Sequence, residues 1–191
     1  MMVIRKGGAL LLTVLLLIGG ILGVSKAMRC FYQKAYPLGY EQMVLSACEE
    51  QGLEPSFVFA VIRTESSFRP DAQSSVGARG LMQITEETFQ WIQFRMGDQS
   101  GVSYDDLFDE QINIRYGTFL LRTLLDEFTS EANALCAYHA GWGNAKKWLQ
   151  NEQYAPDGKN IVNIPFQDTE KYVKKVLDTK QIYEKLYDFS A

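Results

Sequence analysis

Apolar residues recur at intervals of three and four positions along most of the chain after residue 37. This spacing is typical of helices that bury one face, and no segment shows the strict alternation expected of a half-buried strand. The pattern therefore predicts an all-α domain over residues 38–191, long enough to bury a core. Helices are expected over residues 38–51, from Pro55 through Glu65, and over 85–96, 109–128, 131–140, 144–150 and 169–187.

Several of these helices have recognisable ends. Gly52 is placed to terminate the first, and Pro55 to open the second, where its fixed φ and missing N–H cost least. Thr85 is expected to cap the third helix through its hydroxyl. Asp168 or Thr169 is expected to cap the last one.

The beginning of the chain is apolar on every side. Residues 9–24 carry no charge and one hydroxyl group, so a helix here lacks the polar face of a soluble amphipathic helix. The segment is predicted to be a signal-anchor helix or a cleaved signal peptide, with Ser25-Lys26-Ala27 as a passable cleavage site. The length of the run and the lysine favour the anchor. We assign residues 1–28 to this segment, 29–37 to a short connector and 38–191 to the main domain.

Charge is distributed unevenly. The first 34 residues hold five of the 19 basic residues and no acidic one, which leaves 14 basic against 23 acidic residues in the remainder. A nucleic-acid-binding domain would carry a basic surface instead, so nucleic acid is not expected as a partner. Basic residues lie on both sides of the apolar segment, which gives only a weak orientation bias.

The cysteines and the single histidine do not form a metal-binding pattern. Cys30, Cys48 and Cys136 include no C-x-x-C pair, and a zinc site needs three or four ligands, so neither a metal nor an organic cofactor is expected. Cys48 and Cys136 lie in apolar helical patterns and are expected in the core, although the sequence leaves a bridge between them open.

Glu65 is the candidate for acid–base chemistry. It ends an apolar helical run, and the glycine-rich segment Gly77–Ile84 follows twelve residues later. Burial disfavours a charged carboxylate and raises its pKa toward neutrality, as a general acid at neutral pH requires. Asp71 and Glu86 are nearby in sequence, but turn solvation and helix capping explain them.

Four segments in this order resemble the SLT family of lytic transglycosylases, whose fold is lysozyme-like. The resemblance covers nearly all of residues 38–188. The segments are Glu65-Ser66-Ser67-Phe68, Ser74–Ile84, Ala137-Tyr138-His139-Ala140-Gly141 and Ile164–Val173.

The resemblance implies an enzyme without a cofactor that cleaves the β-1,4 bond between N-acetylmuramic acid and N-acetylglucosamine in peptidoglycan and forms a 1,6-anhydromuramoyl product. Glu65 matches the catalytic glutamate. Gly77 and Gly80 are expected to let the backbone approach a sugar closely. The other matching positions, expected to contact substrate, are Ser74, Met82, Gln83, Tyr138, His139, Asp168 and Tyr172.

Two of these positions depart from the family pattern. His139 stands where asparagine is usual, and Asp168 stands where glutamate is usual, which shortens its reach by about one methylene. Among the tryptophans, Trp91 and Trp148 are predicted to pack in the fold, whereas Trp142, between two glycines, is equally suited to a cleft wall.

The sequence favours a bacterial enzyme held at the cytoplasmic membrane by its first helix, with its domain outside and peptidoglycan strands as its partner. Secretion after cleavage of the segment is the alternative. A hydrolase of the same fold stays open because water could replace the sugar's own C6 hydroxyl. A catalytically weak glycan-binding component of a wall-spanning machine also stays open.

Overall fold

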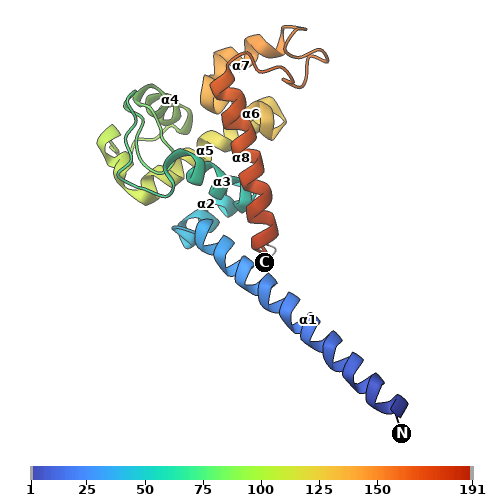
Figure 1. Ribbon diagram of the computed structural model, residues 1–191. Helices are drawn as coiled ribbons and strands as arrows, with labels where there is room; N and C mark the ends of the chain where they lie inside the picture. Colours follow the sequence, from blue (N-terminus) through green and yellow to red (C-terminus); the bar gives the residue numbers. More distant parts are fainter. Residues whose placement is uncertain (1, 190–191) are drawn as a thin grey trace. The chain divides into compact units, whose positions relative to one another are not determined.

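The computed structural model describes residues 2–189, and side chains from residue 13 onward together with that of Leu11. The chain divides into two compact units, Met1–Pro37 and Leu38–Ala191. The first consists mainly of one long helix, α1 (Met2–Ala35), drawn in blue in Figure 1. Within α1, the 23 residues Thr13–Ala35 are long and apolar enough to cross a membrane. At 1.5 Å per residue this segment spans about 35 Å, against about 30 Å for a hydrocarbon core.

The second unit is helical, as predicted, and residues 38–189 contain isolated β-bridges but no strand. Its helices are α2 (Glu41–Gln51), α3 (Pro55–Ser66), α4 (Glu86–Met96), α5 (Glu110–Phe128), α6 (Glu131–Ala140), α7 (Trp142–Leu149) and α8 (Gln167–Leu186), with a 3₁₀ helix, η1 (Tyr104–Phe108).

Helix α3 forms the centre of this unit. It packs along α8, as Figure 1 shows, and also contacts α2. Every residue of α3 from Ser56 to Ile62 is buried, so this helix is surrounded on all sides by protein. Phe59 stacks on Tyr183 of α8 at 5.6 Å between ring centroids. Apolar burial of this kind fixes α3 in place, and α3 carries Glu65 near its end.

Most predicted helix ends are confirmed. Gly52 ends α2 in the left-handed region, and Pro55 occupies the first turn of α3. The Thr85 hydroxyl accepts a hydrogen bond from the Thr88 N–H at 3.3 Å. Both Cys48 and Cys136 are buried and free, as expected of core residues.

Two predicted helix starts are wrong. Helix α7 begins at Trp142, not at residue 144, because the chain already turns at Gly141, which has φ of 91°. Helix α8 begins at Gln167, after Phe166, and neither Asp168 nor Thr169 caps it. The Thr169 hydroxyl is instead hydrogen-bonded to the ring of His139, a partner that sequence spacing does not reveal.

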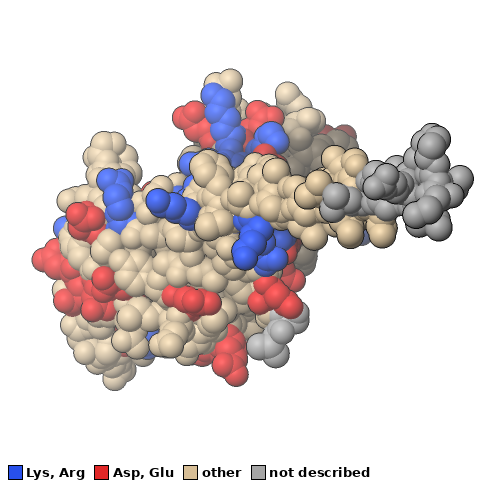
Figure 2. Space-filling model, turned by 60° about the horizontal axis from the view of Figure 1, so that its bottom comes forward, with Lys and Arg blue, Asp and Glu red and all other residues tan. Residues whose placement is uncertain are grey.

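Surface charge is mixed. On the face shown in Figure 2, basic side chains form separate groups among acidic ones. Among the described residues, no group of three or more His, Cys, Asp and Glu side chains lies close enough together to hold a metal ion.

Candidate active site

Glu65 lies at the end of α3, where the chain turns sharply. Ser67 and Phe68 follow with φ of 53° and 63°, in the left-handed region that side chains seldom adopt. The Arg69 Nε–H donates a hydrogen bond to the Ser66 carbonyl at 3.1 Å, which satisfies an otherwise free acceptor at the end of the helix. Two consecutive residues in a strained conformation indicate a constrained turn that fixes the end of α3.

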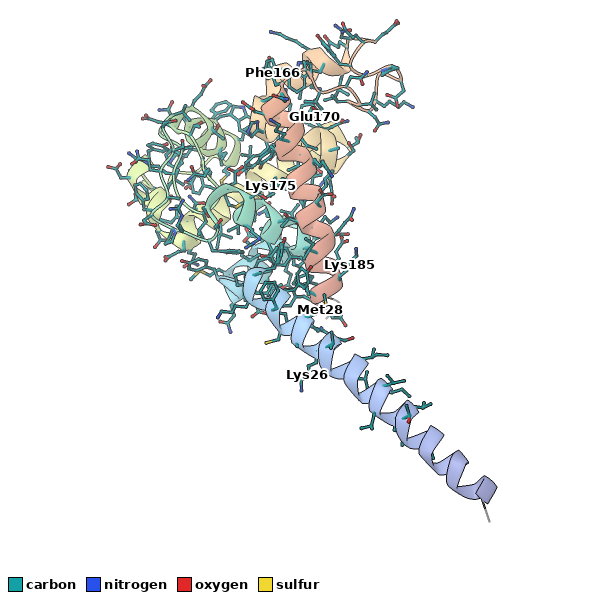
Figure 3. The ribbon with its side chains drawn as sticks, viewed as in Figure 1. Lys26, Met28, Phe166, Glu170, Lys175 and Lys185 are labelled. Atoms are coloured by element: carbon teal, nitrogen blue, oxygen red, sulfur yellow. The ribbon has the colours of Figure 1, made fainter. Side chains whose placement is uncertain are left out.

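The Glu65 carboxyl is partly buried and has one hydrogen-bonding side chain against it. The Tyr172 hydroxyl, from α8, donates to Glu65 Oε1 at 2.6 Å. Burial raises the pKa of Glu65 from 4.5 to about 7, while the hydrogen bond from Tyr172 and the charge of Lys175 lower it. Lys175 lies one turn beyond Tyr172 on α8 and is labelled in Figure 3. Desolvation exceeds the two opposing effects, so a substantial fraction of Glu65 is protonated at neutral pH.

Tyr138 and Tyr172 form a parallel pair beside this carboxyl. Their ring centroids are 6.5 Å apart with an angle of 7° between the planes. Burial and the nearby Glu65 charge raise the pKa of both phenols well above 10, so both remain hydrogen-bond donors. The Tyr138 hydroxyl donates to the Met82 carbonyl at 2.5 Å. The pair thus links Glu65 to the glycine-rich segment.

His139 supports Tyr172 from α6. Its ring stacks on that of Tyr172 at 4.5 Å, and its Nδ1 is hydrogen-bonded to the buried Thr169 hydroxyl at 3.0 Å. Desolvation lowers the pKa of His139, and the Asp168 charge raises it. The histidine therefore joins the end of α6 to the first turn of α8.

The glycine-rich segment is held mainly by its own side chains and by one buried asparagine. Asn113 of α5 accepts from the Met82 N–H at 2.8 Å and donates to the Arg79 and Leu107 carbonyls at 3.0 and 2.8 Å. Gln83 Nε2 donates to the Ala72 and Gly80 carbonyls. These bonds fix the loop without the help of a ligand.

Gly80 does not have the role expected of it. A Cβ at this position would lie 2.1 Å from Asn113 Nδ2 and 2.3 Å from the Leu107 carbonyl oxygen. Its close approach is therefore to α5 and η1, not to a sugar. Gly77, in contrast, has open space where a side chain would stand and a φ of 85°. Only Gly77 retains the freedom that the sequence suggested for both.

The predicted substrate contacts are distributed unequally. Tyr138, His139 and Tyr172 come together at Glu65. The Met82 side chain is fully buried, and the Ser74 hydroxyl accepts from the Ala78 N–H at 3.0 Å within its own turn. Asp168 is exposed on the first turn of α8, where its charge acts on His139. Substrate contact by these residues stays a prediction.

Sequence reasoning missed Asn113 and a neighbouring hollow. An asparagine in the apolar pattern of α5 is the available signal for the first, because a buried amide needs partners. The hollow, of about 330 Å³, opens beside Tyr138 and brings Glu87 and Trp91 of α4 against Trp142 of α7. No local pattern announces it, since its walls come from four helices.

Comparison with known proteins agrees with this geometry. The Transglycosylase SLT domain family matches residues 42–161. The chain is 33% identical over 149 residues to the soluble lytic murein transglycosylase of Salmonella typhimurium, covering 76% of this chain and 23% of that protein. The chain thus spans less than a quarter of the length of this curated relative.

Two solved structures are similar to the fold. One is the 70 kDa soluble lytic transglycosylase of Escherichia coli, with a TM-score of 0.74 and 30% identity over 81% of this chain and 25% of that one. The other is an inactive mutant of the lytic transglycosylase Slt of Pseudomonas aeruginosa, with a TM-score of 0.70 and 30% identity over 82% of this chain and 27% of that one.

Proposed function

The chain belongs to the Transglycosylase SLT domain family, and from this premise we propose that it cleaves peptidoglycan by non-hydrolytic transglycosylation, with Glu65 as the single acid and then base. The substrate bond is the β-1,4 linkage between N-acetylmuramic acid and N-acetylglucosamine. The observation that carries the proposal is the half-buried Glu65 carboxyl under the Tyr172 hydroxyl, with a pKa raised to about 7. A group with this pKa exchanges a proton readily in both directions at neutral pH.

The reaction needs two proton transfers through the same carboxyl. Protonated Glu65 gives its proton to the bridging oxygen as the bond from C1 of the muramoyl ring to that oxygen breaks. The N-acetyl group of the same ring stabilises the positive charge at C1. The Glu65 carboxylate then takes the proton from the C6 hydroxyl as its oxygen bonds to C1, which closes the anhydro ring and restores the acid. The attacking group belongs to the substrate, so proximity favours it over water.

The surrounding side chains suit this cycle. Tyr172 can hold the carboxylate form between the two transfers, because its hydroxyl donates to Oε1. Tyr138 and Gln83 are proposed to contact the sugar and its acetamido group, and Ser74 and Asp168 the flanking positions. Neither a metal nor an organic cofactor is required by this scheme.

We place the enzyme at the cytoplasmic membrane with the main domain outside. The support is the length and apolar character of Thr13–Ala35 together with the extracytoplasmic substrate. Intact mass and carbonate extraction of the membrane fraction test this placement. A shortened protein in the soluble fraction would show a cleaved signal peptide instead.

Mass spectrometry of the products tests the chemistry. The full-length protein in detergent is incubated with purified peptidoglycan, and E65Q serves as the control. Products ending in anhydromuramic acid, lighter by one water than hydrolysis products, are expected from the wild type only. Reducing ends would establish a hydrolase, and binding without products would favour a glycan-binding component.

A further inference from the structure

The hollow beside Tyr138 has the composition of a carbohydrate site. Its volume is about 330 Å³, and its walls include Trp91, Trp142 and Tyr138, with Glu87 and Thr88 as polar groups. Ligand sites commonly combine apolar and aromatic walls with a few polar groups that fix orientation. The C–H faces of a sugar ring suit the aromatic walls, and its hydroxyl and amide groups suit Glu87 and Thr88.

Both tryptophans are held in place without a ligand. Their rings lie 5.9 Å apart at an angle of 51°, and the edge of Phe128 packs against Trp142 at 5.1 Å. The Lys146 ammonium lies 5.8 Å from the Trp142 ring centroid, and the Arg95 guanidinium lies 5.6 Å from that of Trp91. Each ring is nevertheless only half-buried. Rings fixed in advance lose little freedom when a ligand stacks on them.

Glycines keep the mouth of the hollow open. Gly141 and Gly143 stand on either side of Trp142 and line the hollow. A Cβ at either position would meet nothing within 4 Å, so packing does not demand a glycine there. At Gly141 the backbone itself does, with φ of 91°. At Gly143 the absence of a side chain leaves space beside the Trp142 ring.

Continuity with Glu65 indicates what occupies the hollow. Tyr138 lines the hollow, and its ring also stacks on Tyr172, whose hydroxyl is bonded to Glu65. A chain of three side chains therefore leads from the hollow to the reactive carboxyl. A glycan strand with one ring at Glu65 can reach the hollow with a neighbouring ring.

We propose that this hollow is a binding subsite for an N-acetylhexosamine ring of the strand, in which Trp91 and Trp142 contact the ring and Glu87 accepts its hydrogen bonds. The proposal rests on the glycan substrate of the proposed function, but it concerns affinity and not the chemical step. It also assigns Trp91 a binding surface, where the sequence predicted packing alone.

Tryptophan fluorescence offers a direct test. The chain has three tryptophans, and the third, Trp148, is buried against Phe166 and does not line the hollow. In full-length E65Q/W148F, emission therefore comes from the two rings of the hollow. The probe is the β-1,4-linked tetramer of N-acetylglucosamine, titrated in detergent, and E65Q prevents turnover. A saturable change of emission is expected.

Two variants in that background locate the binding. W142A is expected to weaken the affinity about tenfold, and E87Q about threefold, the usual range for loss of a stacking partner and of one hydrogen bond. The E87Q change is at an exposed position and leaves the core intact, so it carries the test if W142A unfolds. Circular dichroism identifies that case.

The possible outcomes separate the subsite from the reaction. Emission that does not respond to millimolar tetramer, or equal affinities of the parent and E87Q together with a folded W142A, would overturn the subsite even if anhydro products form. A saturable response weakened by these changes would support the subsite even if the product assay shows no transglycosylation.

Discussion

Two neighbouring regions that share Tyr138 are built on opposite principles. At Glu65, the surroundings alter a single ionisable group, because burial raises its pKa to about 7 against the hydrogen bond from Tyr172. In the aromatic hollow, Trp91 and Trp142 remain half-exposed and offer a surface. The first arrangement changes the reactivity of a group, and the second provides contact area. Substitutions should therefore change the rate in one region and the affinity in the other.

The largest expected effect is that of Glu65→Gln. Glutamine keeps an oxygen that can accept from Tyr172 but cannot transfer a proton, so kcat should fall by about 10²–10⁴-fold. Release of products from labelled peptidoglycan measures it. Affinity for the N-acetylglucosamine tetramer should be unchanged. Activity within tenfold of the wild type would remove Glu65 from its assigned role.

The same substitution should stabilise the fold at high pH. The pKa of Glu65 is about 7 in the folded protein against 4.5 without the fold, so the native state holds this proton more tightly. Its contribution to stability is complete below pH 4.5 and is lost as the pH rises through 7. The stability of E65Q relative to the wild type should therefore increase between pH 5 and pH 8, by on the order of 2 kcal/mol.

Urea unfolding of both proteins at the two pH values measures this difference. Groups common to both proteins cancel in the comparison. A difference that is constant with pH would mean that Glu65 titrates normally.

Tyr172→Phe should reduce kcat about tenfold and also move the pH profile. Protonated Glu65 starts the reaction, so activity should decline as the pH rises above about 7. The Tyr172 hydrogen bond lowers the pKa of Glu65, and its loss should shift this alkaline limb to higher pH. Tyr138→Phe is the matched control, because its hydroxyl binds the Met82 carbonyl. An alkaline limb that Y172F leaves in place would contradict the assigned hydrogen bond.

The smallest effect is expected from His139→Asn. Asparagine can keep a hydrogen bond to Thr169, although it loses the stacking on Tyr172, so activity should stay within about threefold. His139→Ala leaves the buried Thr169 hydroxyl without this partner and should cost about 1 kcal/mol of stability. A large loss of activity in H139N with unchanged thermal unfolding would give the histidine a dedicated role in the reaction.

Local patterns predicted much of the fold because helices are formed by contacts close in sequence. The three- and four-residue spacing marked the helices, and Gly52, Pro55 and Thr85 marked ends whose partners lie within a turn. The start of α8 was misplaced for the opposite reason. Thr169 has a suitable side chain for a cap, but its hydroxyl is bonded to a residue 30 positions away.

The sequence by itself determined the helical class, the apolar first segment and the candidate acid, since each follows from the order and spacing of residues. Only the tertiary structure decided what surrounds that acid. Tyr172 is 107 positions from Glu65, and the packing of α3 along α8 brings them within 2.6 Å. It also decided that Gly80 faces Asn113 and that Trp91 meets Trp142 across the hollow. Burial and long-range contacts set pKa values and binding surfaces, and neither is a property of a local segment.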